Sequence, residues 1–147
     1  MRISSQAFTD GGKIPDKYTK YGENRIPPLH IDDVPERARS LALIVDDPDA
    51  PSGTFNHWLL FNVDPKTRDI KEDCVPVMAT QGRNDYGEVQ YGGPRPPSGE
   101  HRYFFKAFAL DTVLPLSRGT NRQQLEQEMQ NHVLESATLM GKYAHNQ

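Results

Sequence analysis

Hydrophobic residues in this chain gather in three stretches whose patterns predict β-strands. Residues 40–46 form a near-continuous apolar run, which is typical of a strand buried on both faces. Residues 55–63 and 101–110 are two further strand-like runs, and successive side chains of a strand point to opposite faces. The pattern therefore predicts at least three strands separated by loops.

The alternation assigns the polar residues of the two later strands to particular faces. In 55–63, His57 is expected at the end near the loop, on the face that also carries Phe55, Leu59, Phe61 and Val63. In 101–110, one face is expected to carry His101, Tyr103, Phe105, Ala107 and Ala109. Arg102 and Lys106 take the opposite face.

One amphipathic helix is predicted towards the C-terminus. Thr120 and Gln123 have the spacing of a capping box, and apolar residues recur at helical spacing at Leu125, Met129 and Val133. The helical pattern is expected to continue, as a second segment, through Leu134, Ala137 and Met140. Gly141 is the expected stop.

The distribution of glycine and proline along the chain favours a mainly β fold. Its 11 glycines and 12 prolines are spread between the strand-like runs. Strands followed by helical sequence, without βαβ alternation, argue against a doubly wound nucleotide-binding fold. The sequence contains no internal repeat and no linker, so residues 1–147 are expected to form one domain.

Charge and cysteine content narrow the function classes. A net charge of −3 without a basic run predicts no nucleic-acid partner. No apolar run approaches the ~20 residues of a membrane span, and the N-terminus lacks the apolar stretch of a signal peptide. The single cysteine, Cys74, fits a reducing compartment and is expected to be a passive residue. The expected location is the cytoplasm.

Polar and titratable residues concentrate in two loop segments beside the predicted strands. The first is Asp47-Pro48-Asp49-Ala50-Pro51, with His57 close behind; the second runs from Gly92 to Tyr103 and contains His101. Proline stiffens such a loop, and glycine lets the backbone approach a ligand closely. A stiff loop with a few exposed donors can form an anion-binding concavity. Two carboxylates, two imidazoles and a phenol suit a small anion.

Each of these residues also has a purely structural interpretation. Asp-Pro-Asp-Ala-Pro is a turn signal by itself, His57 fits a core histidine bonded to backbone, and Tyr103 fits a core aromatic residue. The combination favours a binding site. Because an unpartnered imidazole on an apolar face is costly, an aspartate is expected to accept the His57 N–H and favour the imidazolium. Asp47 and Asp49, two positions apart, are expected to project the same way.

The two segments, in this order, resemble the phosphatidylethanolamine-binding protein family, which includes the Raf kinase inhibitor proteins and the plant flowering-time regulators. The resemblance covers almost the whole chain. It implies an antiparallel Greek-key β-sandwich with a small C-terminal helical appendage. It also implies a small cavity for phosphate, acetate, cacodylate or a phosphoryl-ethanolamine headgroup, with no metal or other cofactor. Histidines and tyrosine would donate to the anion while aspartates orient the histidines, at Asp47, Asp49, His57, His101 and Tyr103.

The sequence departs from the eukaryotic members of the family in three respects, and the tight loop and the direct His57-Trp58 step resemble its prokaryotic, Raf kinase inhibitor-like branch. Asn56 precedes His57 where those members carry a second histidine. Arg95 stands where they place a glycine whose backbone N–H meets the ligand, and its guanidinium adds a bidentate anion contact. The loop before His101 is also shorter. Resemblance to prokaryotic members implies a homodimer.

The resulting prediction is a non-enzymatic protein that binds a small anion or phosphoryl ligand and regulates a partner such as a kinase. One alternative is a protease inhibitor that acts through a surface segment. Another is an Asp/His hydrolase, or a site in which two histidines and an aspartate hold zinc. The chain contains no HExxH, GxSxG or Walker pattern, which disfavours the enzyme classes.

Overall fold

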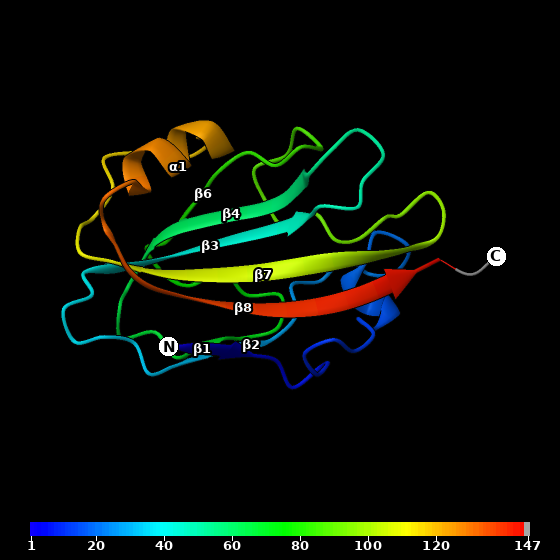
Figure 1. The fold of residues 1–147 in the computed structure, drawn as a ribbon, viewed down its shortest axis with the longest axis horizontal. Coiled ribbons are helices and arrows are strands. Elements are labelled where there is room, and N and C mark those ends of the chain that lie inside the picture. The colour runs from blue at the N-terminus through cyan, green and yellow to red at the C-terminus, as the bar shows by residue number, and fades with distance from the viewer. Residues whose placement is uncertain (146–147) are drawn as a thin grey trace.

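The strands form two antiparallel sheets (Figure 1), which the computed structural model describes over residues 1–145. The larger sheet has the order β6-β4-β3-β7-β8, built from Thr80–Gln81, Phe55–Val63, Ser40–Asp47, Glu100–Leu110 and Val133–Ala144. The smaller sheet has the order β1-β2-β5, built from Arg2–Ser4, Leu29–Asp32 and Asp69–Ile70. A short 3-10 helix, η1, covers Asp16–Tyr18, and one α-helix, α1, covers Arg122–Met129. The predicted mainly β fold is confirmed.

β3 is the central strand, and all eight of its residues are buried. On one face, Leu43 and Val45 join the apolar layer between the two sheets, where Ile3, Ile31 and Phe105 also pack. On the other face, Ala42 and Ile44 pack in a second cluster with Leu125 and Met129 of α1. Figure 1 shows α1 (orange) and the small-sheet strands β1 and β2 (blue) on opposite sides of the larger sheet. The double burial predicted from the apolar run is therefore confirmed.

β4 contains two irregularities that change which face its residues occupy. Val45 pairs with Trp58 and Asp46 with Asn56, so His57 is an extra residue on β4. Leu41 pairs with Val63 and Leu43 with Leu60, and Asn62 has a φ of 54° within this second irregularity. An extra residue shifts the side-chain alternation of a strand by one position.

The prediction that His57, Leu59, Phe61 and Val63 lie on one face of the strand is therefore wrong. Leu59 and Phe61 pack in the cluster beneath α1, whereas Val63 packs between the sheets. The His57 ring contacts Tyr103, itself a member of the layer between the sheets, with 5.2 Å between ring centroids. The face predicted for β7 is correct, because Tyr103, Phe105, Ala107 and Ala109 all pack in that layer.

The C-terminal helical prediction is correct only for its first part. Helix α1 is capped by Asn121, in a capping box with Gln124, one position later than expected. It ends at Met129, and the residues predicted to form a second helix form strand β8. β8 pairs with β7 along nearly its whole length, which places Leu139 and Tyr143 in the core. Tertiary pairing thus overrides the helical spacing of Leu134, Ala137 and Met140.

Gly141 lies within β8 and does not stop a helix. Its backbone faces Ile14, and a Cβ at this position would come within 2.5 Å of the Ile14 side chain. The N-terminal segment also bonds to this strand, because Lys142 N–H donates to the Gly12 carbonyl at 2.8 Å. The glycine therefore permits a close approach between two chain segments. Across residues 1–145, no helix has both the length and the apolar character to cross a membrane.

Leu43→Ala is expected to lower the free energy of unfolding by about 2–5 kcal/mol, because it leaves a cavity beneath a strand that is covered on both faces. Urea unfolding followed by circular dichroism measures this change. Val77, which is 85% exposed, is the matched control. Val77→Ala is expected to change stability by no more than about 0.5 kcal/mol. Equal effects of the two substitutions would contradict the central position of β3.

Candidate functional site

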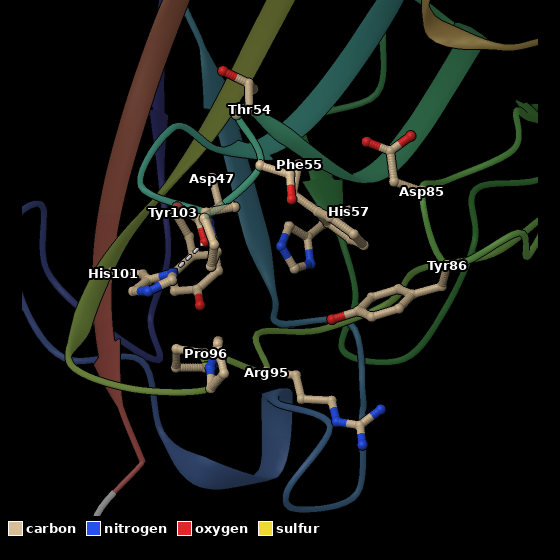
Figure 2. Close-up of a pocket in the computed structure, with 15 residues that line it drawn as sticks. Asp47, Thr54, Phe55, His57, Asp85, Tyr86, Arg95, Pro96, His101 and Tyr103 are labelled. Atoms are coloured by element: carbon tan, nitrogen blue, oxygen red, sulfur yellow. Dashed lines mark hydrogen bonds and ion pairs between the residues drawn. The ribbon is translucent and has the colours of Figure 1, made fainter.

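A cavity of about 430 Å³ lies where the loop after β3 meets the loop that precedes β7. Figure 2 shows Asp47, His57, His101 and Tyr103 around it, with Pro96 and Arg95 along one rim. These residues come from the ends of β3, β4 and β7 and from the proline-rich loop between Gly92 and Gly99. Five of the six predicted residues line the cavity: Asp47, His57, Arg95, His101 and Tyr103.

Asp47 orients His101. The His101 Nδ1–H donates to Asp47 Oδ2 at 2.6 Å, and both side chains are buried. The other oxygen of Asp47 accepts the backbone N–H of Asp49 at 2.7 Å. One carboxylate therefore closes the turn after β3 and fixes the tautomer of His101, which leaves Nε2 as the ring nitrogen for a ligand.

Asp49 has a different partner and does not line the cavity. Its two oxygens accept the Nε–H and Nη2–H of Arg102 at 2.9 and 2.8 Å, and Oδ2 also accepts the Arg102 backbone N–H at 2.9 Å. These hydrogen bonds hold the pKa of Asp49 down, at about 2. The expectation that Asp47 and Asp49 project the same way is wrong, because the chain turns between them.

His57 is bonded to backbone and not to an aspartate. Its Nδ1–H donates to the carbonyl of Gly92 at 2.7 Å. Burial lowers the pKa of His57, and the Gly92 carbonyl and the nearby charge of Asp47 only partly oppose that shift. The predicted hydrogen bond from the His57 N–H to an aspartate is therefore wrong, and so is the expectation that the surroundings of His57 favour the imidazolium. The bulge in β4 turns the ring towards the glycine loop instead.

Tyr103 places a hydroxyl group in the cavity wall without a protein partner. Its side chain is almost completely buried, and the hydroxyl oxygen has no hydrogen-bond partner among residues 1–145. The ring lies between the two histidines, 5.2 Å from the His57 centroid and 6.4 Å from that of His101. Burial raises the pKa of the phenol strongly, so the group is an O–H donor at neutral pH.

Tyr86 is a cavity residue that sequence reasoning missed. Its hydroxyl donates to the Gly93 carbonyl at 2.9 Å, Lys20 Nζ lies 4.2 Å from its ring centroid, and burial raises its pKa to about 12. The neighbouring Asp85 accepts the backbone N–H of Asn56 at 2.6 Å. Asn84-Asp85-Tyr86-Gly87 reads as a turn in the sequence, and nothing in that pattern links it to the other two segments.

Figure 2 shows the Arg95 guanidinium directed away from the centre of the cavity.

The glycine- and proline-rich loop is held in place by a segment from the other end of the chain. Asn24 Oδ1 accepts the Gly93 N–H at 2.7 Å, and the Tyr21 hydroxyl donates to the Pro96 carbonyl at 2.8 Å. The Lys20 N–H donates to the Pro94 carbonyl at 2.9 Å. Gly93 packs so closely against this segment that a Cβ would lie 2.3 Å from the Tyr18 carbonyl oxygen. The loop is therefore preformed, as a binding site requires.

Asp49→Asn is expected to destabilise the protein by about 1 kcal/mol at pH 7, because it weakens a partly exposed bidentate pair. A lowered pKa stabilises the fold above the unfolded-state value near 3.8 and loses that effect as pH falls towards about 2. The stabilities of the two proteins should therefore converge below about pH 4. Urea unfolding between pH 7 and pH 3 tests this, with exposed Glu36→Gln as the control. A constant difference across this range would contradict the ion pair.

Comparison with known proteins shows the family to which this chain belongs. A UPF0098 protein of Methanothermobacter thermautotrophicus is 48% identical over 97% of this chain and 98% of its own length. A solved phosphatidylethanolamine-binding protein homologue of Chlamydia trachomatis matches with a TM-score of 0.95 and 41% identity, over 99% of this chain and 97% of that one. YbcL of E. coli, described as a member of the mammalian family, matches with a TM-score of 0.92 and 27% identity, over 99% and 98% of the two chains. The model of the phosphatidylethanolamine-binding protein family matches residues 4–144, and the chain belongs to that family.

Proposed function

We propose that this protein binds a small oxyanion or phosphoryl group in the cavity between His57, His101 and Tyr103, without catalysing a reaction. The Tyr103 hydroxyl is the observation that carries the proposal. It is buried and lacks a protein partner among residues 1–145, although a buried unsatisfied hydroxyl is costly. A ligand oxygen in the cavity accepts its hydrogen bond and removes that cost.

The remaining groups supply orientation and charge. Asp47 fixes the His101 ring, so the Nε2 atom is held ready for the ligand. Arg95 lies on the rim, where its guanidinium attracts an anion from solvent. The cavity volume of about 430 Å³ suits a phosphoryl group with a small substituent and lies at the small end of ligand sites. Membership of a family named for phosphatidylethanolamine supports a binding role, and a phosphoethanolamine-like headgroup fits that volume.

The binding role can be stated without choosing a protein partner. Regulation of a kinase, inhibition of a protease, formation of a homodimer and a cytoplasmic location stay predictions from the sequence. Within residues 1–145, no group of three or more His, Cys, Asp and Glu side chains is arranged to hold a metal ion. Both oxygens of Asp47 accept protein N–H groups, so the carboxylate serves the histidine and the turn.

Tyr103→Phe is expected to weaken phosphate binding by about tenfold or more, because it removes a donor to a charged ligand. The stability of the free protein should stay the same or rise, since the substitution deletes an unsatisfied hydroxyl. Isothermal titration calorimetry with phosphate and phosphoethanolamine, alongside thermal unfolding, measures both effects. Tyr143→Phe is the matched control, because that hydroxyl donates to Asp16 outside the cavity. Unchanged affinity in the Tyr103 variant would overturn the proposed site.

Asp47→Asn is expected to weaken anion binding by about tenfold even though it removes a negative charge. Both Asp47 oxygens accept hydrogen bonds, and asparagine has only one acceptor oxygen, so either His101 or the Asp49 turn loses its partner. Simple charge repulsion predicts the opposite sign. The same titrations decide between them, with Asp111→Asn as control for an aspartate–histidine pair outside the cavity. Tighter binding by the Asp47 variant would rule out the orienting role.

A further inference from the structure

We infer that the cavity selects oxyanions that still carry an acidic proton, and that His57 makes this selection. The inference rests on the proposed function and specifies its ligand class. Phosphomonoesters and inorganic phosphate satisfy the requirement, whereas phosphodiesters and sulfate do not. The distinguishing feature is a hydrogen-bond acceptor in the wall of an anion site, where donors are the usual complement of an anion.

The acceptor is Nε2 of His57. The Nδ1 atom lies 2.7 Å from the Gly92 carbonyl oxygen, which can only accept a hydrogen bond, so the proton of the ring is on Nδ1. A neutral imidazole with its proton on Nδ1 has a lone pair on Nε2. Figure 2 shows the His57 ring directed into the cavity, between Tyr103 and Tyr86. The hydrogen bonds found within residues 1–145 involve only the Nδ1 atom of this ring, so Nε2 is free to accept a donor from a ligand atom in the cavity.

The surroundings of His57 keep the ring neutral. Only 3% of the residue is exposed, and the rings of Phe55, Tyr86 and Tyr103 pack against it. This burial lowers the pKa of His57 more than the neighbouring carbonyls and the charges of Asp47 and Asp85 raise it. The other titratable or charged residues that line the same cavity are Asp47, Asp85, Tyr86, Arg95, His101 and Tyr103. The Arg95 guanidinium is always cationic, and a nearby positive charge also disfavours an imidazolium at His57.

A fully deprotonated oxyanion has no proton to donate to the His57 Nε2 atom. An oxygen lone pair placed against the Nε2 lone pair leaves two buried acceptors without a donor, which is unfavourable. A protonated oxygen donates to Nε2 instead, while the other oxygens accept from Tyr103. A phosphomonoester keeps one proton below its second ionisation, at about pH 6, and a phosphodiester has no such proton. Inorganic phosphate retains an O–H in both of its forms near neutral pH.

Sulfate is a direct probe, because it has the tetrahedral shape of phosphate but carries no proton in the neutral range. Calorimetric titrations at pH 6 with phosphate, sulfate, methyl phosphate and dimethyl phosphate test the selection. We expect phosphate and methyl phosphate to bind about tenfold to a hundredfold more tightly than sulfate and dimethyl phosphate. Equal affinities for phosphate and sulfate would overturn the selection by His57 and leave the proposed function intact. Failure of all four anions to bind would overturn the proposed function itself.

The pH dependence provides a second measurement on the unmodified protein. Between pH 6 and pH 8, the affinity for methyl phosphate should fall relative to that for inorganic phosphate, by up to about tenfold per pH unit. Asp47, Asp85 and His101 face the same cavity, and both ligands meet the same protein groups there, so the ratio of the two affinities reports on the proton of the ligand. A constant ratio over this range would contradict the inference.

His57→Gln supplies the matched variant. Glutamine is polar and similar in reach, but its amide offers an N–H donor as well as an acceptor, so it can meet either kind of oxyanion. The variant is expected to bind phosphate and sulfate with similar affinity, and thermal unfolding confirms that it is folded. Retention of the full preference for phosphate in a folded variant would assign the selection to another residue.

Discussion

β3 ends with two consecutive aspartates that are both buried, and the arrangement of the cavity follows from how each is paired. A buried carboxylate requires charge or hydrogen-bond partners. Asp46 faces the α1 side of the sheet, where Lys106 and Arg122 each approach to 2.8 Å. Asp47 points to the other side, where His101 donates to it. The same buried strand thus joins α1 to the sheet with one carboxylate and orients the cavity histidine with the next.

The cavity is rigid because its walls are fixed by residues far apart in the sequence. The loop from Gly92 to Gly99 is tied to Lys20, Tyr21 and Asn24 through its backbone. Outside the cavity, Asp49 and Arg102 clamp the turn after β3 to the first residues of β7. Proline removes donors from the first loop, so the fixed donors and acceptors that remain determine what the cavity recognises. A preformed site loses little entropy when it binds.

The bulge in β4 gives the cavity its mixed hydrogen-bonding character. By inserting His57 as an extra residue, the strand brings the imidazole to the side of the sheet that holds Tyr103. The Gly92 carbonyl then determines which nitrogen carries the proton. A strand without the bulge would direct the ring towards the α1 side, and the cavity would lose its acceptor. Bulges commonly re-aim a side chain near functional sites, and this one follows that pattern.

The sequence by itself was sufficient for the mainly β class, for the burial of β3 and for five of the residues that line the cavity. Except for Arg95, which the family resemblance singled out, these follow from local patterns: an apolar run, alternation along β7, and stiff loops next to polar residues. Only the tertiary structure decided how those residues are paired. The bulge in β4 places His57 on a different face of the sheet from the predicted one. Asp49 bonds to Arg102 and so does not line the cavity. Pairing with β7 makes residues 133–144 a strand. The turn that contains Tyr86 lies at the cavity because the Tyr86 hydroxyl donates to the Gly93 carbonyl of the glycine loop. Hydrogen-bond partners distant in the sequence leave no periodic signal, so the ligand-facing atoms became visible only in the folded chain.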